Sequence, residues 1–168
     1  SCTHDDTALR PEEPQIDTNY LQIPIGFDDP YFPPDNPYSA AKFELGRLLF
    51  YEKMLSRDSS IQSCSHCMKQ EHAFTDGKVN PLGIGGDVQF RNGMSVVNTS
   101  YRTLYFWDGR GKAIETTALR SIWMPDVFGS DTNDIIRRLQ SHPLYPSLFK
   151  RAFGENAIPQ CYLVAKAI

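Results

Sequence analysis

The sequence lacks three features that would place it in a common functional class. Its 17 basic and 20 acidic residues give a net charge of −3 with no long run of either sign, so neither nucleic acid nor an anionic membrane surface is implied as a partner. Nowhere do about 18 apolar residues run together, so no membrane span is predicted. Four cysteines in 168 residues are too few for a disulfide scaffold.

What is present is enough for one domain with a hydrophobic core, since 40% of the residues are hydrophobic. The chain shows no internal repeat and no convincing run of alternating strands. Helix signals occur instead, such as Ser39 as an N-cap, Pro146 in a first turn and Gly154 as a stop. We predict a mostly α fold, with helices over about 40–51, 112–122, from 131 or 132, from 146 to 154, and 157–168.

Two long segments carry no helical period. Residues 1–37 are rich in proline, aspartate and asparagine, which predicts an extended N-terminal arm lying on a domain formed by residues 38–168. The arm is expected to be anchored by its apolar side chains, Ile23, Ile25, Phe27, Tyr31 and Phe32. Residues 77–98 contain five glycines, which predicts a long functional loop.

The most specific motif is a Cys-x-x-Cys pair, Cys64 and Cys67. Such a pair can bind a metal, exchange electrons, form a tight disulfide or attach a haem through thioethers. In the haem case the next residue is normally the histidine that ligates the iron, and here that residue is Met68.

The residues alone leave several interpretations of this pair open. Cys64 and Cys67 could hold a haem, form a disulfide or remain as buried thiols. A metal site could also form with His66 and His72, although the usual second pair of ligands is absent.

Further strings follow one another at short intervals around the motif, and together they resemble the bacterial di-haem cytochrome c peroxidase family, which includes the MauG-type proteins. The resemblance covers about residues 20–168 and implies a cytochrome c-like haem domain with long loops. It corresponds to the N-terminal, peroxidatic domain only, so the C-terminal second haem domain of the family is expected to be absent. The strings are Leu45-Gly46-Arg47-Leu48-Leu49-Phe50, Leu55-Ser56, Ala73-Phe74-Thr75-Asp76-Gly77, Arg91-Asn92 with Asn98, and Phe106-Trp107-Asp108-Gly109-Arg110.

The resemblance assigns roles to individual residues. Cys64 and Cys67 match the haem thioether cysteines, and Met68, in place of the proximal histidine, becomes the candidate axial ligand of the haem iron. Trp107 matches a tryptophan on the electron path between the haems, although a tryptophan would also be a core residue in any fold. Asn92 matches a ligand of calcium at the domain interface.

Three departures fall where peroxide chemistry requires specific groups. Ile84 stands at the position of a distal histidine, Thr117 at that of a distal glutamine, and Val127 at that of a glutamate that acts as acid and base. Threonine and valine cannot move a proton between the peroxide oxygens. We therefore expect little peroxidase activity.

Two functional hypotheses follow. The first is a di-haem cytochrome c peroxidase-like oxidoreductase domain that transfers electrons and reduces hydrogen peroxide, with haem c, calcium and a c-type cytochrome or similar electron donor. A second haem domain or a homodimer partner, and a periplasmic or outer-surface location with a lipid anchor on Cys2, belong to this hypothesis. The alternative is a degenerate, haem-free relative that acts as a binding or assembly subunit, also held to a membrane by a lipid on Cys2.

Overall fold

The structure is a computed structural model that describes residues 20–58, 63–83 and 86–168. Within these ranges the chain forms six α-helices and three short 3₁₀ turns, and only isolated β-bridges, which confirms the predicted mostly α fold. The α-helices are α1 (Ala40–Tyr51), α2 (Cys64–Cys67), α3 (Ile114–Trp123), α4 (Thr132–Ser141), α5 (Tyr145–Phe153) and α6 (Cys161–Ala167); the 3₁₀ turns are η1 (Lys53–Leu55), η2 (Gln70–His72) and η3 (Thr99–Tyr101).

Helix α1 is central to the packing. The Ser39 side chain accepts a hydrogen bond from the Lys42 backbone N–H at 3.2 Å, so the predicted N-cap and helix are confirmed. Helices α5 and α6 both pack against α1. The contact with α6 is backbone to backbone, because a Cβ atom added at Gly46 would lie 1.8 Å from the Ala167 carbonyl oxygen.

Local signals also set the ends of α4 and α5. Asp131 caps α4 by accepting from the backbone N–H of Asn133 at 2.8 Å. Helix α5 carries Pro146 in its first turn and ends at Gly154, whose φ is +103°. Helix α6 is shorter than predicted and starts at Cys161. Pro159 disfavours the helical backbone conformation at the residue that precedes it, so the helix begins only after this proline.

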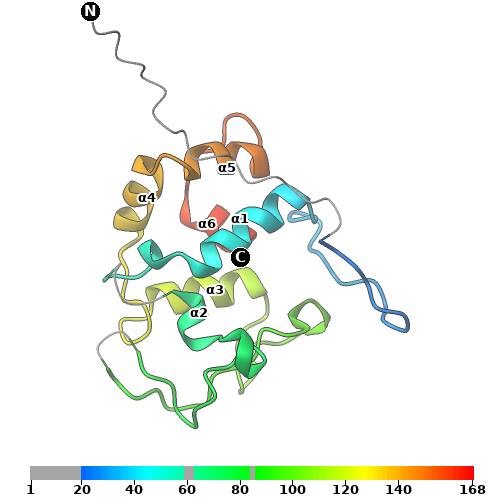
Figure 1. The fold of residues 1–168 in the computed structure, drawn as a ribbon, viewed down its shortest axis with the longest axis vertical. Coiled ribbons are helices and arrows are strands. Elements are labelled where there is room, and N and C mark those ends of the chain that lie inside the picture. The colour runs from blue at the N-terminus through cyan, green and yellow to red at the C-terminus, as the bar shows by residue number, and fades with distance from the viewer. Residues whose placement is uncertain (1–19, 59–62, 84–85) are drawn as a thin grey trace, which may run out of the picture.

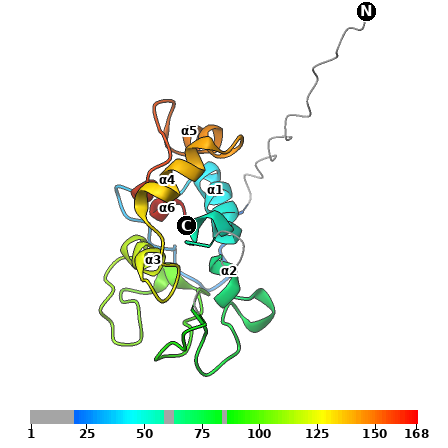
Figure 2. The ribbon, with the colours of Figure 1, turned by 90° about the vertical axis from the view of Figure 1, so that its left-hand side faces the viewer.

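The core lies where α1, α3, α4, α5 and α6 meet. Figures 1 and 2 show α1, α4, α5 and α6 together at one end of the molecule, with the loops that follow α2 at the other. Side chains at this meeting point are almost fully excluded from solvent: Leu45, Leu49, Leu55, Ile122, Ile135, Leu139, Leu148, Phe149 and Val164. No helix in the described part of the chain is long and apolar enough to cross a membrane.

The arm is anchored only in part as predicted. All five of its proposed apolar anchors are exposed, but the Phe27 ring contacts the Tyr101 ring edge-on, with 5.6 Å between the ring centres. Polar contacts also attach the arm. The Asn36 side-chain amide donates to the Glu115 carboxylate at 3.1 Å and to the Lys166 carbonyl at 3.0 Å. An extended chain with frequent prolines cannot turn every apolar side chain toward one surface.

Candidate functional site

The Cys-x-x-Cys motif forms α2, a helix of a single turn. Its i, i+3 spacing places the Cys64 and Cys67 thiols on one face of that turn. Cys64 packs against the hydrophobic core, whereas the Cys67 sulfur faces the loop, 4.0 Å from the Leu82 carbonyl oxygen. Met68 ends the turn, and its backbone N–H donates to the Cys64 carbonyl at 3.2 Å.

Both thiols are held in the protonated form. Burial raises the pKa of Cys64 to about 12, and the neighbouring Cys67 adds to the effect. Burial, followed by the charge of Asp76, also raises the pKa of Cys67. Both are free thiols in this structure, so it does not contain the disulfide considered above. A reactive redox motif needs a lowered thiol pKa, and these environments do the opposite.

The metal site with histidine ligands is not formed. Within the described ranges no three His, Cys, Asp or Glu side chains come together closely enough to hold an ion. His66 sits between the cysteines on the turn, at a spacing that turns its side chain away from theirs. The His72 ring lies instead against Gly77, 3.1 Å from the position a Cβ atom would take there. Both histidines are exposed, so the structure does not support a metal site as the interpretation of this pair.

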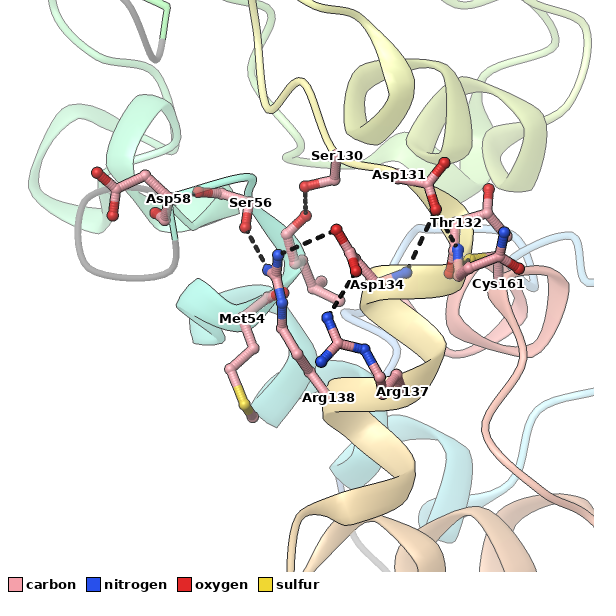
Figure 3. Close-up of polar contacts among 12 residues, drawn as sticks. Met54, Ser56, Asp58, Ser130, Asp131, Thr132, Asp134, Arg137, Arg138 and Cys161 are labelled. Atoms are coloured by element: carbon pink, nitrogen blue, oxygen red, sulfur yellow. Dashed lines mark hydrogen bonds and ion pairs between the residues drawn. The ribbon is translucent and has the colours of Figure 1, made fainter.

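The turn that precedes α2 is fixed from α4 (Figure 3). The Arg138 guanidinium donates to the Met54 carbonyl at 2.9 Å and to the Ser56 carbonyl at 2.7 Å. The Ser130 hydroxyl donates to the buried Leu55 carbonyl at 2.7 Å. Three successive carbonyl groups of the turn thus accept hydrogen bonds, two from Arg138 of α4 and one from Ser130, which fixes the turn at residues 54–56.

A second set of contacts joins the same turn to α5. One oxygen of the Glu52 carboxylate accepts from the Met54 backbone N–H at 2.9 Å. The other accepts from the Tyr145 hydroxyl at 2.6 Å. Burial, followed by this hydrogen bond, raises the pKa of Tyr145, so its hydroxyl remains a donor.

Trp107 lies in a tight turn whose backbone is closed by two hydrogen bonds between Tyr105 and Gly111, at 2.8 and 3.1 Å. Phe106 takes a φ of +62° there, which a bulky residue rarely adopts. Trp107 is 64% exposed, so the expectation that it would be a core residue in any fold was wrong. Its indole N–H donates to the Asn92 carbonyl at 2.8 Å.

The positions predicted to face peroxide carry no group that titrates. Thr117 is buried, and its hydroxyl donates to the Ala113 carbonyl within α3 at 2.8 Å. Val127 packs at the edge of the core. Ile84 and Cys2 lie outside the described residues. Gly83, next to Ile84, is so close to the Asp126 carbonyl that a Cβ atom would overlap it, at 1.5 Å.

Asn92 joins two segments of the loop region. Its side-chain amide donates to the Lys78 carbonyl, while its own carbonyl accepts from Trp107. No cluster of carboxylates surrounds it among the described residues. The calcium assignment therefore rests on the resemblance.

Sequence reasoning did not identify the ion pairs that surround Trp107 or the α4 residues that hold the turn at 54–56. Arg91 and Arg110 both pair with Asp108, at 2.7 and 2.6 Å. These residues lie in the Arg-Asn and Trp-Asp-Gly-Arg strings. The opposite charges close to the tryptophan were the sequence signal from which these ion pairs could have been predicted. Arg138 and Ser130 gave no such signal.

A helical domain with a Cys-x-x-Cys turn against its core is cytochrome c-like in fold class. The chain belongs to the di-haem cytochrome c peroxidase family, whose model matches residues 40–168. Haem c is the cofactor that this family implies.

Sequence relatives of this chain carry the names of proteins from the same family. The methylamine utilization protein MauG of Methylorubrum extorquens is 34% identical over 124 residues, covering 74% of this chain and 35% of the relative. The cytochrome c peroxidase Ccp of Escherichia coli is 32% identical over 126 residues, covering 71% of this chain and 27% of the relative. The chain thus spans about a third of the length of such relatives.

Solved structures share the fold. A MauG-like protein associated with microbial copper homeostasis superimposes with a TM-score of 0.78 at 30% identity, covering 86% of this chain and 44% of the other. The di-haem peroxidase BthA of Burkholderia thailandensis gives a TM-score of 0.62 at 18% identity, covering 79% and 37% of the two chains, a likeness in fold alone.

The residues present fit part of what haem c requires. Two protonated thiols on one face of a helical turn, one of them against the hydrophobic core, suit thioether attachment. The axial position does not fit the family's histidine, because Met68 follows the second cysteine. A thioether sulfur is an established haem ligand, so the donor set fits a methionine-ligated haem.

Proposed function

We propose that this chain is the N-terminal haem domain of a di-haem cytochrome c peroxidase-like oxidoreductase, and that its working role is electron transfer. The observation that carries the proposal is the α2 turn, with both thiols on one face beside the core. In this proposal residues 38–168 form the haem domain, residues 1–37 form its arm, and a second haem domain or a partner copy completes the protein.

Each predicted site residue has a role in the proposal. Cys64 and Cys67 hold the haem, and Met68 supplies the axial sulfur. Trp107 carries the electron path, and Asn92 binds calcium. The electron donor is a c-type cytochrome or similar protein, the location is periplasmic or outer-surface, and Cys2 is the site of a lipid anchor.

A bound haem would supply one-electron chemistry, and a methionine ligand would favour its reduced state. The residues around the haem determine whether it could also reduce hydrogen peroxide. Reduction of hydrogen peroxide needs a group that transfers a proton between its oxygens, and Thr117 and Val127 cannot do so. Two nearby carboxylates already have other partners, since Glu115 accepts from Asn36 and Asp131 caps α4. We expect peroxide turnover about 10²–10⁴-fold below that of an enzyme with a positioned acid–base group.

The alternative, a haem-free binding or assembly subunit, is less well supported. Relatives at 30% identity or more carry the names of peroxidases and MauG proteins. The free thiols of α2 also leave the attachment chemistry available.

The test is the intact mass of the protein isolated from its own source, read beside its visible spectrum. A mass one haem above that of the polypeptide, after the mass of any lipid on Cys2 is subtracted, supports the proposal when it comes with a Soret band that is lost in the Cys64→Ala/Cys67→Ala variant. A colourless protein with the mass of the bare polypeptide would contradict it and favour the alternative.

A further inference from the structure

Two adjacent residues of the glycine-rich loop contact two adjacent residues of the aromatic turn. The Asn92 carbonyl accepts from the Trp107 indole N–H at 2.8 Å, and the Arg91 guanidinium pairs with the Asp108 carboxylate at 2.7 Å. We call these four residues the loop clasp. Both contacts join the same two segments. Each contact therefore holds the segments at the separation that the other contact requires.

The carboxylate in the clasp is held from its own turn as well. The Arg110 guanidinium pairs with Asp108 at 2.6 Å, and the Arg110 backbone N–H donates to the same carboxylate at 3.3 Å. The Arg110 guanidinium also lies 4.1 Å from the centre of the Phe106 ring. The Arg91 guanidinium, followed by that of Arg110, holds the pKa of Asp108 well below its usual range. Asp108 is therefore charged at neutral pH.

The Trp107 side chain has little else to hold it. It is 64% exposed, so packing restrains its ring weakly. The backbone of its turn is fixed by the paired hydrogen bonds between Tyr105 and Gly111, but these bonds do not restrain a side chain. A single hydrogen bond at an exposed site contributes little on its own. The orientation of the indole ring thus depends on how firmly Asn92 is kept in place beside it.

We propose that Arg91 and Asp108 are positioning residues that hold Asn92 against Trp107 and so fix the orientation of the indole ring at the protein surface. The inference rests on the proposed electron path for its functional meaning. A ring on such a path must keep a set distance and angle to the groups on either side, and the clasp supplies that restraint without touching the ring face.

The test is hydrogen exchange of the indole N–H groups in the ¹⁵N-labelled 168-residue chain, measured by NMR. The chain has two tryptophans, Trp107 and Trp123, and the Trp123→Phe variant assigns the two signals. In the Arg91→Met variant we expect the exchange of the Trp107 indole to rise roughly three- to tenfold, the effect of weakening one hydrogen bond. The Trp123 signal is an internal control and stays unchanged.

Two further variants separate a specific clasp from a general effect of charge. Arg137→Met removes an ion pair of the same length, 2.7 Å, on the exposed side of α4, and should leave the Trp107 exchange at the wild-type rate. Arg91→Lys retains the positive charge and should restore exchange to within about twofold of wild type. If Arg91→Met does not fold, added salt provides a second route in the unmodified chain, because it screens this partly exposed pair and should accelerate Trp107 exchange alone.

An unchanged Trp107 exchange rate in Arg91→Met, or an equal rise in Arg137→Met, would overturn the clasp. Failure of the electron path is a separate result, read from Trp107→Phe in the haem-loaded protein. If the donor reduces that variant as fast as wild type, while Arg91→Met still accelerates exchange of the Trp107 indole N–H, the loop clasp is supported and the electron path is contradicted.

Discussion

Met68 is the residue on which the chemistry of the site depends most. It directly follows the second cysteine, and its backbone closes the α2 turn onto Cys64. Histidine in that place would complete the Cys-x-x-Cys-His pattern of c-type haem attachment. The backbone there makes no demand that only methionine can meet, since its φ of −125° suits most residues.

We predict that Met68→His, produced with a haem-attachment system, carries haem on at least as large a fraction of its chains as wild type, because histidine completes the attachment pattern. Its reduction potential should fall by a sizeable part of the ~0.8 V range that axial ligands span, because methionine ligation raises the potential. Mass spectrometry and potentiometric titration provide the two readouts. Met94→His, in the long loop, is the matched control and should change neither.

A second residue-scale prediction concerns Glu44, which is 1% exposed and pairs with Arg47 at 2.6 Å. The hydrogen bond from Arg47 holds the pKa of Glu44 below its usual value. A carboxylate with a lowered folded-state pKa stabilises the fold above its unfolded pKa of about 4.3, and that contribution is lost as the pH falls through the folded-state pKa.

Glu44→Gln should therefore lower the free energy of unfolding by about 1 kcal/mol or less at pH 7, with the difference from wild type shrinking as the pH falls below the unfolded-state pKa. Urea denaturation at pH 7, 5 and 3.5 measures this. Asp134→Asn, which breaks a more exposed pair with Arg137, should show a smaller difference. A constant gap between Glu44→Gln and wild type at all three pH values would contradict the assignment.

At the scale of elements, α4 and the residues before it support the turn that leads to the cysteines. Ser130→Ala should destabilise the protein by about 1–3 kcal/mol, because it leaves the buried Leu55 carbonyl without its donor. Denaturation midpoints measure the change. Ser141→Ala removes a hydroxyl from the exposed end of the same helix and should cost less than about 0.5 kcal/mol. Equal losses in the two variants would show that the turn does not depend on this bond.

The elements differ in how far the sequence could predict them. Helices α1 and α5 were predicted almost to the residue, since Ser39, Pro146 and Gly154 act within a few positions of themselves. The contacts of Arg138 with Met54 and Ser56 join residues 84 and 82 positions apart, and no local pattern encodes them. The anchoring of the arm was predicted only in part for a related reason, because its apolar residues gave no information about which surface would be available to them.

The candidate site divides in the same way. The spacing of Cys64 and Cys67 was enough to place their thiols together, since one helical turn determines it. The exposure of Trp107 could not be read from its aromatic neighbours, because burial is decided by distant segments. The alternative of a metal site is not supported, because among the described residues neither histidine joins the cysteines in a group that could hold an ion.

At the scale of the whole molecule, the contact between α1 and α6 determines how closely two helices that lie far apart in the sequence can pack. Gly46→Ala should destabilise the protein by about 1–3 kcal/mol, although alanine is the better helix former, because the added methyl group meets the Ala167 carbonyl. Thermal unfolding measures this. Gly93→Ala, whose Cβ atom would make only ordinary contacts of 3.5 Å or more, should be close to neutral.

The same contact has a consequence for synthesis on the ribosome. Helix α1 is made early, yet its partner α6 comes late, and Asn36 and Lys166 meet across 130 positions. Contacts of such high sequence separation slow folding, since the loop between them must be closed first. The side of α1 that packs against α6 therefore stays uncovered in the nascent chain until α6 has been made, even after α5 has covered its own part of the helix.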